Sequence, residues 1–306
     1  MSRIFLFILI GVTLLFSAEF LFTNRTFVYR DIHLLQYPGK IFAISCIRDG
    51  FLPFWNPYIQ CGSPFLAIPY HQALYPLSIL VYSLPFAFGI DLFVCLHIFL
   101  AGLFFYLLMK DQGLDLTASL FASLSYALSG IFLSTGNTII TLSSATWTPI
   151  LILFYLRSLK MQSIKYALLS GLVIAMQFLS GTPDYLCLDF GLLFLLTMSW
   201  SIHKKSLFPI KSFLLLVLAG IGLCLFQMLP FLELVLLSDR MGGLSFSEVS
   251  FWSLGLYDIL NIFIPLGTAI PSESYIFPYI GQKMTTSLYI GILPIISLSV
   301  LGKSRI

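Results

Sequence analysis

Charged residues are scarce in this 306-residue chain, because Asp, Glu, Lys and Arg together make up only 9% of it. A soluble domain carries about 25%, so the composition excludes an ordinary soluble domain. Hydrophobic residues make up 58% of the chain, and they gather in continuous runs of about 20 residues, the length of a membrane-spanning helix. Barrel strands alternate apolar and polar residues instead, so the runs predict an all-α membrane protein. The formal net charge of +3 is too small to indicate binding of nucleic acid.

The chain also lacks most of the short motifs that identify an enzyme. It has no glycine-rich loop for a phosphate, no zinc-ligand spacing such as C-x-x-C, and no nucleophile triad. Of its five cysteines, Cys95, Cys187 and Cys224 lie in apolar runs and are interpreted as small buried hydrophobic residues. Cys46 and Cys61 share a polar loop, where they either form a disulfide in an oxidising compartment or remain two free thiols.

Hydropathy predicts a single polytopic domain of residues 1–306 with about eight transmembrane helices. The first run also fits a signal peptide, but the large Phe16 makes a poor cleavage site, so the run is interpreted as a span. Residues 36–48 are expected to form an amphipathic helix on the membrane surface, and residues 75–88 an interfacial or re-entrant helix. The expected spans are residues 4–22, 90–109, 116–134, 139–156, 164–179, 185–200, 212–237 and 288–301.

The distribution of Lys and Arg orients these spans. With the N-terminus in the cytoplasm, ten basic residues fall on the cytoplasmic side and six on the outer side, as the positive-inside rule expects. Counting residues 75–88 as a full span would move the basic residues near positions 157 and 204 to the outside. We therefore expect two extracytoplasmic loops, at residues 23–75 and 238–287.

Short sequence pieces spread over nearly the whole chain form an ordered set. The pieces are Asp31, Gly50-x-x-Pro53-x-Trp55-Asn56-Pro57-Tyr58, Tyr75-Pro76-Leu77, His97, Tyr126-x-x-Ser129-Gly130, Trp147-x-Pro149, Gly181-x-Pro183, Gln227-x-x-Pro230-x-x-Glu233 and Tyr289-Ile290-Gly291. Each piece alone is weak, but the ordered set resembles the YfhO family of bacterial membrane proteins. Family members are usually longer, so we expect a short member or an N-terminal part. The turn Gly-Thr-Pro-Asp at 181–184 also departs from the Gly-His-Pro-Gln common in the family.

That family is similar in fold to the C-type (GT-C) glycosyltransferases, so the resemblance implies a GT-C-like helical bundle. It implies a multi-pass protein of the bacterial plasma (inner) membrane that transfers a hexose with inversion. The donor would be a polyprenyl-phosphate-linked sugar, and the acceptor a glycan or teichoic-acid-like polymer of the cell envelope. The family's catalytic position matches Asp31, which would take the acceptor's proton as the new bond forms. No cofactor is certain; related folds admit a divalent metal, for which this sequence shows no dedicated site.

Aromatic and histidine side chains of the first loop are candidates for substrate binding. Trp55, Asn56 and Tyr58 fit a sugar subsite, and they fit equally an interfacial aromatic belt with a proline-fixed turn. His71 fits acid–base work, but its distance from the other histidines in the sequence gives no metal-ligand spacing. The sequence leaves both interpretations open.

Four charged residues complete the list of candidates. Arg48 and Arg240 fit contacts to a carrier phosphate or to anionic lipid headgroups. Asp184 would begin a helix, where its charge is favourable in any case, and Glu233 lies close enough in sequence to pair with Arg240. An alternative function is a transporter or lipid flippase, although the sequence shows no convincing internal repeat; a non-catalytic scaffold is a third.

Overall fold

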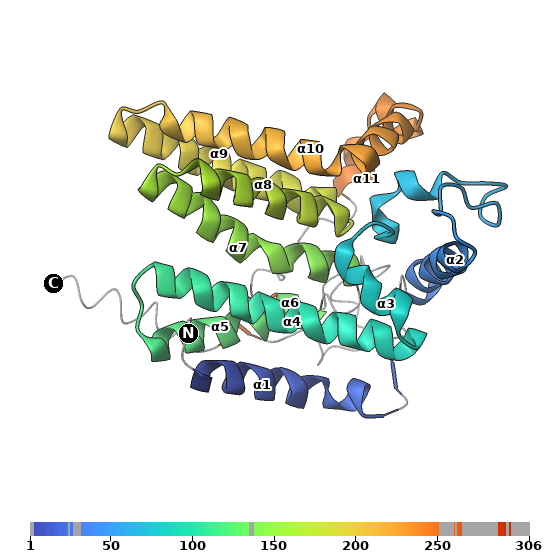
Figure 1. Ribbon diagram of the computed structural model, residues 1–306, viewed down its shortest axis with the longest axis horizontal. Helices are drawn as coiled ribbons and strands as arrows, with labels where there is room; N and C mark the ends of the chain where they lie inside the picture. Colours follow the sequence, from blue (N-terminus) through green and yellow to red (C-terminus); the bar gives the residue numbers. More distant parts are fainter. Residues whose placement is uncertain are drawn as a thin grey trace.

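The computed structural model describes residues 3–23, 25–26, 32–134, 138–250, 260, 262–264, 287–291 and 294, apart from the side chains of residues 3, 131 and 240. Within these ranges the chain is helical, and it contains no strand beyond one isolated bridge between Asn56 and Ser63. The long helices lie side by side and run lengthwise through the molecule (Figure 1). The predicted all-α, multi-span membrane architecture is confirmed.

Among the described residues, six helical segments are long and apolar enough to cross a membrane, fewer than the eight expected from hydropathy for the whole chain. The helix α8 (Ile164–Leu179) has 16 residues and a length of about 24 Å, short of the roughly 30 Å hydrocarbon core. Most of the expected span at 288–301 lies outside the described residues. The six segments are α1 (Arg3–Leu21), α4 (Phe86–Asp111), α5 (Leu116–Ala127) with α6 (Gly130–Ser134), α7 (Ile139–Met161), α9 (Pro183–Lys204) and α10 (Phe208–Leu236).

The segment between α1 and α4 folds into short helices at one end of the bundle (Figure 1). The helix predicted at residues 36–48 is present as α2, and the segment 75–88, expected as an interfacial or re-entrant helix, is helical from Pro76 to Ser83 and breaks before Pro85. Leu84 is extended and Pro85 caps α4, because a proline disfavours helix in the residue before it. The elements are η1 (Ile32–Gln36), α2 (Tyr37–Arg48), η2 (Phe65–Ala67), η3 (Pro69–His71), η4 (Pro76–Ser78) and α3 (Ile79–Ser83); η6 (Asp239–Gly242) and α11 (Phe246–Ser250) follow α10.

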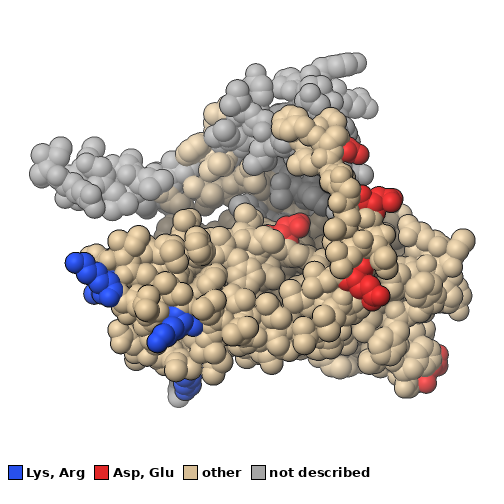
Figure 2. Space-filling model, turned by 90° about the horizontal axis from the view of Figure 1, so that it is seen from above, with Lys and Arg blue, Asp and Glu red and all other residues tan. Residues whose placement is uncertain are grey.

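The two ends of the bundle differ in charge. The end that carries residues 32–83 is called the loop end. The opposite end, called the lysine end, holds the turns that follow α4, α7 and α9, whose last turns carry Lys110, Lys160 and Lys204. Lys and Arg gather at one end of the face seen in Figure 2, and most Asp and Glu lie towards the other. At the lysine end, Arg157 Nε donates to Asp111 Oδ1 at 2.6 Å.

The main core is built by α4, α7 and α8, and two glycines bring α10 close against α8. A Cβ added at Gly171 would lie 2.8 Å from the carbonyl oxygen of Leu216, and one added at Gly220 would lie 2.6 Å from Ile174 Cγ2. Helix association in a bilayer depends on such close packing, because lipid tails are as apolar as the side chains. The polar residues described next lie where this core meets the loop end.

Candidate functional site

A lysine is completely buried at the loop end. The side chain of Lys40, on α2, is 0% exposed, and its Nζ donates a hydrogen bond to Gln72 Oε1 at 3.0 Å. Nζ also lies 5.5 Å from the centre of the Phe93 ring. Among the described residues no carboxylate pairs with it. Burial without a counter-ion disfavours the ammonium form and lowers the pKa of Lys40 to about 7.

One face of the helical segment formed by η1 and α2 is buried against the protein. Gln36, Gly39, Lys40 and Ala43 follow the three- and four-residue spacing of one helix face, and all four are buried. Ile41, on the other side, is exposed. These four residues are covered by the first loop, where Ala43 packs with Phe65, and the position of α2 on the membrane surface stays a prediction.

Gln72 connects this helix to the membrane-spanning part. Its side chain is fully buried, accepts from Lys40, and donates through Nε2 to Ser143 Oγ at 2.8 Å and to the Ser180 carbonyl oxygen at 2.6 Å. Its backbone has φ of +54°, in the left-handed region, and its carbonyl oxygen accepts from Ser78 Oγ at 2.9 Å. One side chain therefore joins α2, the first loop, α7 and the turn after α8.

The hydrogen bonds continue from this point into the bundle. The hydroxyl groups of Ser144 and Ser180 bond to each other, and Gln177 Nε2 donates to the Ser144 carbonyl oxygen at 3.3 Å. Gln177 Nε2 also donates to Asp189 Oδ2 at 2.6 Å, and Thr148 Oγ1 donates to the same oxygen at 2.7 Å. Together with Lys40, Gln72 and Ser143, these residues form the Lys40–Asp189 network, which extends from α2 through α7 and α8 to α9.

A second buried group fixes the loop onto α4 and α7. His97 Nδ1 lies 2.7 Å from the Phe93 carbonyl oxygen, so this nitrogen carries the proton and Nε2 is an acceptor. Tyr75 OH therefore donates to His97 Nε2 at 2.7 Å and accepts from Trp147 Nε1 at 2.9 Å. These three residues come from three of the pieces that carry the family resemblance.

Other pieces of that ordered set also meet. Gln227 Nε2 donates to the Leu66 carbonyl oxygen at 3.2 Å, and the backbone N–H of Gly130 donates to the Tyr289 carbonyl oxygen at 2.7 Å. A Cβ at Gly181 would lie 3.0 Å from the Pro69 carbonyl oxygen, so the turn and the loop approach too closely for a side chain there. Gln227 and Gly181 therefore lie against the first loop, and Gly130 lies beside Tyr289.

Two buried polar atoms beside Lys40 have no hydrogen-bond partner among the described residues. His71 stacks on Phe65 with ring centres 4.0 Å apart, and a Cβ at Gly39 would lie 2.7 Å from its Nδ1. Neither His71 Nδ1 nor Gln36 Oε1 has a hydrogen-bond partner among the described residues. Burial, and then the charge of Lys40, lower the pKa of His71 to about 4, so the ring is neutral near pH 7. A buried amine with unpartnered polar atoms nearby is suited to a ligand that carries both an anion and hydroxyl groups, which donate and accept hydrogen bonds.

The aromatic candidates of the first loop lie on its surface. Trp55 is 57% exposed and its ring covers Gly62, while Tyr58 is 85% exposed and meets the edge of Phe42. Asn56 is buried instead: its Oδ1 accepts from the Tyr58 N–H at 3.0 Å, and its backbone pairs with Ser63. Asn56 therefore shapes the turn that presents the two rings.

The charged candidates are not brought together. Arg48, Asp184 and Glu233 are exposed, and no described contact joins them to one another. Asp31 and the side chain of Arg240 lie outside the described residues, so the catalytic position and the Glu233–Arg240 pairing stay predictions. Within the described ranges, no three His, Cys, Asp or Glu side chains are grouped so that they could hold a metal ion.

Sequence reasoning missed the residues with the most buried polar contacts. The candidates drawn from the sequence include none of Lys40, Gln72, Gln177 and Asp189. A carboxylate within a predicted span, as at Asp189, is by itself a functional signal. A glutamine inside an apolar run, as at Gln177, is a second signal that points to the network. Cys46 is buried, Cys61 is exposed, and both are free thiols.

Comparisons of the chain with models of protein families and with curated proteins find no match.

Proposed function

We propose that this protein is a membrane glycosyltransferase that moves a sugar from a polyprenyl-phosphate donor to an acceptor outside the cytoplasm. The observation that supports this most is the buried Lys40, for which the described residues provide no carboxylate, beside the unpartnered atoms Gln36 Oε1 and His71 Nδ1. Its position at one end of a bundle of membrane-spanning helices is where a lipid's headgroup would lie.

The energetics of Lys40 favour an anionic ligand. A buried charge without a partner costs several kcal/mol, and a phosphate oxygen at hydrogen-bond distance from Nζ would offset much of that cost. The same contact would raise the lowered pKa of Lys40 and keep the ammonium charged. Gln36 Oε1 and His71 Nδ1 would then accept hydrogen bonds from hydroxyl groups, the commonest polar groups of a sugar.

The transfer itself needs a base. An oxygen of the acceptor's hydroxyl attacks the anomeric carbon, the bond to the phosphate oxygen breaks, and polyprenyl phosphate leaves with the bonding electrons. The base takes the hydroxyl proton. Asp31 is our candidate, because it immediately precedes the segment 32–36 and is nine residues before Lys40.

The orientation that we propose puts the loop end outside the cytoplasm, in a bacterial plasma membrane. Lys110, Lys160 and Lys204 at the lysine end support it, because short cytoplasmic turns are rich in Lys and Arg. The acceptor would then be a glycan or teichoic-acid-like polymer of the cell envelope, and the family resemblance suggests the same class of reaction.

One observation favours a second candidate, a transporter or lipid flippase. The carboxylate of Asp189 is buried between α7, α8 and α9 and bonded to Gln177 and Thr148, and ionisable groups within spans often mark translocation paths. The rest of the network lies at the loop end, which supports the transferase instead.

Reconstitution into vesicles tests the proposal. The purified protein would be given a panel of polyprenyl phosphates carrying a labelled hexose, with membrane extract as the source of acceptor. Label that enters a polymer supports a transferase, and label that crosses the bilayer without a new glycosidic bond supports a flippase. If the folded protein shows neither activity with any hexose of the panel, the transferase and the flippase are both refuted.

A further inference from the structure

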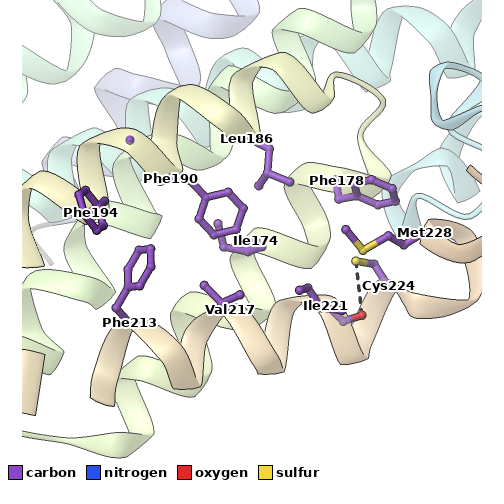
Figure 3. A pocket seen from close by; sticks show the side chains of 11 residues that line it. Ile174, Phe178, Leu186, Phe190, Phe194, Phe213, Val217, Ile221, Cys224 and Met228 are labelled. Atoms are coloured by element: carbon purple, nitrogen blue, oxygen red, sulfur yellow. Dashed lines mark hydrogen bonds between the residues drawn. The ribbon is translucent and has the colours of Figure 1, made fainter. Parts of the chain in front are cut away.

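Two pockets of different chemistry lie beside α9. The pocket between α9 and α10 is lined by apolar side chains such as Phe190, Phe194 and Phe213 (Figure 3), and none of the described residues that line it is charged. The other, called the basic pocket, lies at the lysine end, between the last turns of α7 and α9. Its described lining consists of Leu159, Lys160, Met161, Gln162, Trp200 and Lys204. Of the two pockets, the basic pocket is the one suited to a charged ligand.

Hydrogen-bond donors predominate among the polar groups of the basic pocket. Lys160 and Lys204 carry ammonium groups, and the indole N–H of Trp200 can only donate. The amide of Gln162 adds two further N–H groups. No Asp or Glu occurs among the described residues that line this pocket. Because the oxygens of an ionised phosphate only accept, this set of donors is complementary to a phosphate group.

The charges around the basic pocket are not balanced. Asp111 is shared by two cations, since Arg157 Nε lies 2.6 Å from its Oδ1 and Lys160 Nζ lies 3.8 Å from its Oδ2. Lys204 forms no ion pair with any described residue. Three positive charges therefore face one carboxylate, which leaves two of them without a partner of opposite charge. An anion in the pocket would supply that partner.

Lysines are common at the carboxyl ends of helices, where they interact with the last carbonyl groups. Here the backbone already satisfies part of that need. The carbonyl oxygen of Ser158, at the end of α7, accepts from two backbone N–H groups that follow the helix, and the carbonyl oxygen of Ser201 does the same at the end of α9. Lys160 Nζ donates instead to Gln112 Oε1 at 3.1 Å, and Lys204 donates to no described carbonyl. Both ammonium groups can therefore reach a ligand.

The surroundings of the basic pocket indicate what kind of phosphate it would hold. Met161, Ile164 and Ile202 lie close to it in sequence, and their side chains are exposed. Exposed apolar side chains next to lysines, with a partly buried tryptophan at position 200, are typical of the level at which hydrocarbon meets the headgroups. A soluble phosphate has no group that would cover these apolar side chains, whereas the acyl chains of a phospholipid do.

We infer that the basic pocket binds the phosphate of an anionic phospholipid, with Lys160 and Lys204 on its oxygens and the Trp200 indole N–H as a third donor. Basic pockets between spans are a known way of binding such headgroups. A choline headgroup would bring its own cation next to the two lysines, so the site prefers a lipid with a net negative charge. The lipid joins the ends of α7 and α9. The site lies at the opposite end of the bundle from Lys40, and no step of the proposed transfer uses it.

Native mass spectrometry of the full chain tests this inference. The protein would be released from micelles that contain equal amounts of phosphatidylglycerol and phosphatidylcholine, and the lipids still bound would be counted. We expect phosphatidylglycerol to be preferred, and Lys160→Gln with Lys204→Gln to lower that preference about tenfold or more, because two charge-assisted hydrogen bonds are lost. Lys165→Gln with Lys211→Gln is the matched control: both lysines are exposed at the same end and neither lines the pocket, so this variant should keep the preference.

A third variant separates the site from the general charge of the lysine end. Trp200→Phe keeps a ring and every charge but removes the N–H donor, and it should lower the preference about fivefold. Thermal unfolding of each variant checks that it folds. Inorganic phosphate and glycerol phosphate, added to the micelles, should leave the bound phosphatidylglycerol in place.

Four results would overturn the inference. They are a wild-type protein without preference for phosphatidylglycerol, an equal loss in the two double lysine variants, no effect of Trp200→Phe, and displacement of the lipid by inorganic phosphate. An equal loss in the two double variants would mean that the charge of the whole end attracts the lipid. Displacement by inorganic phosphate would mean that the pocket serves a soluble phosphate. Binding is measured without any sugar donor, so the result is independent of the proposed transferase activity.

Discussion

Replacing Lys40 by methionine removes a buried charge and keeps an unbranched side chain of similar length. Lowering the pKa of Lys40 from 10.5 to about 7 corresponds to a cost of about 5 kcal/mol for the charged form, at about 1.4 kcal/mol per pKa unit. The variant leaves Gln72 Oε1 without a donor, which costs about 1–3 kcal/mol. The difference between these two costs predicts that Lys40→Met is more stable than the wild type by about 2–4 kcal/mol at about pH 6.

The stability difference between Lys40→Met and the wild type should depend on pH. Between about pH 7 and 10.5 the unfolded chain binds a proton at Lys40 that the folded protein does not, so wild-type stability rises with pH across this window. Below about pH 7 both states bind the proton and the full cost is present. The advantage of Lys40→Met should therefore be largest below about pH 7 and should reverse before pH 10.5, because the unpaired Gln72 Oε1 still costs about 1–3 kcal/mol there. Chemical unfolding in detergent at several pH values would measure this.

Function should change in the opposite direction. If Lys40 binds the donor's phosphate, Lys40→Met should lose about tenfold to a hundredfold or more in donor affinity, because a charge-assisted hydrogen bond is worth about 1.5–3 kcal/mol. Lys165→Met, at an exposed position of the lysine end, is the control for loss of a charge. A variant that is destabilised equally at all pH values, or that binds donor normally, would refute the reasoning.

Three further predictions concern the loops. Asp31→Asn should lower transfer by about 10²–10⁴-fold at normal protein abundance, whereas Asp49→Asn, at the end of α2, should cost much less; equal losses would remove Asp31 from its role. A single cysteine at position 204 should escape an impermeant thiol reagent in intact cells, and its labelling would reverse the proposed orientation. Cys46→Ser with Cys61→Ser should keep activity, since both thiols are free; full loss at normal abundance would contradict this.

The membrane spans could be predicted from the sequence because the bilayer imposes a simple rule: backbone groups in hydrocarbon must bond within a helix, and the side chains must be apolar. Their ends were less certain. The helix α4 begins at Phe86, after Pro85, four residues before the expected start, and α9 extends beyond the predicted 185–200 at both ends. Hydropathy does not predict the first and last residues of these helices, because capping residues and prolines determine them.

The candidate site could not be predicted in the same way, because its residues are joined by contacts between distant parts of the chain. The bond from Gln72 to Ser180 spans 108 positions, and the bond from Gln227 to Leu66 spans 161. The partners of the buried face of α2 could not be predicted for a related reason. Helix periodicity finds a polar face, but only the tertiary partner decides whether that face meets water or, as at Lys40, another buried polar group.

At Gln72, the hydrogen bonds of the side chain are stronger than the preference of the backbone. A left-handed conformation costs a residue with a Cβ about 1–2 kcal/mol, and glycine would adopt φ of +54° without that cost. A glycine, however, would lose the bonds to Lys40, Ser143 and Ser180. Ser143 Oγ and the Ser180 carbonyl oxygen would keep the bond between them, but Lys40 Nζ would be buried without a hydrogen-bond partner. That costs a charged group more than about 1–3 kcal/mol, which exceeds the backbone strain. Local backbone preference therefore yields here to a side chain that holds the first loop, and with it Lys40, against the ends of α7 and α8.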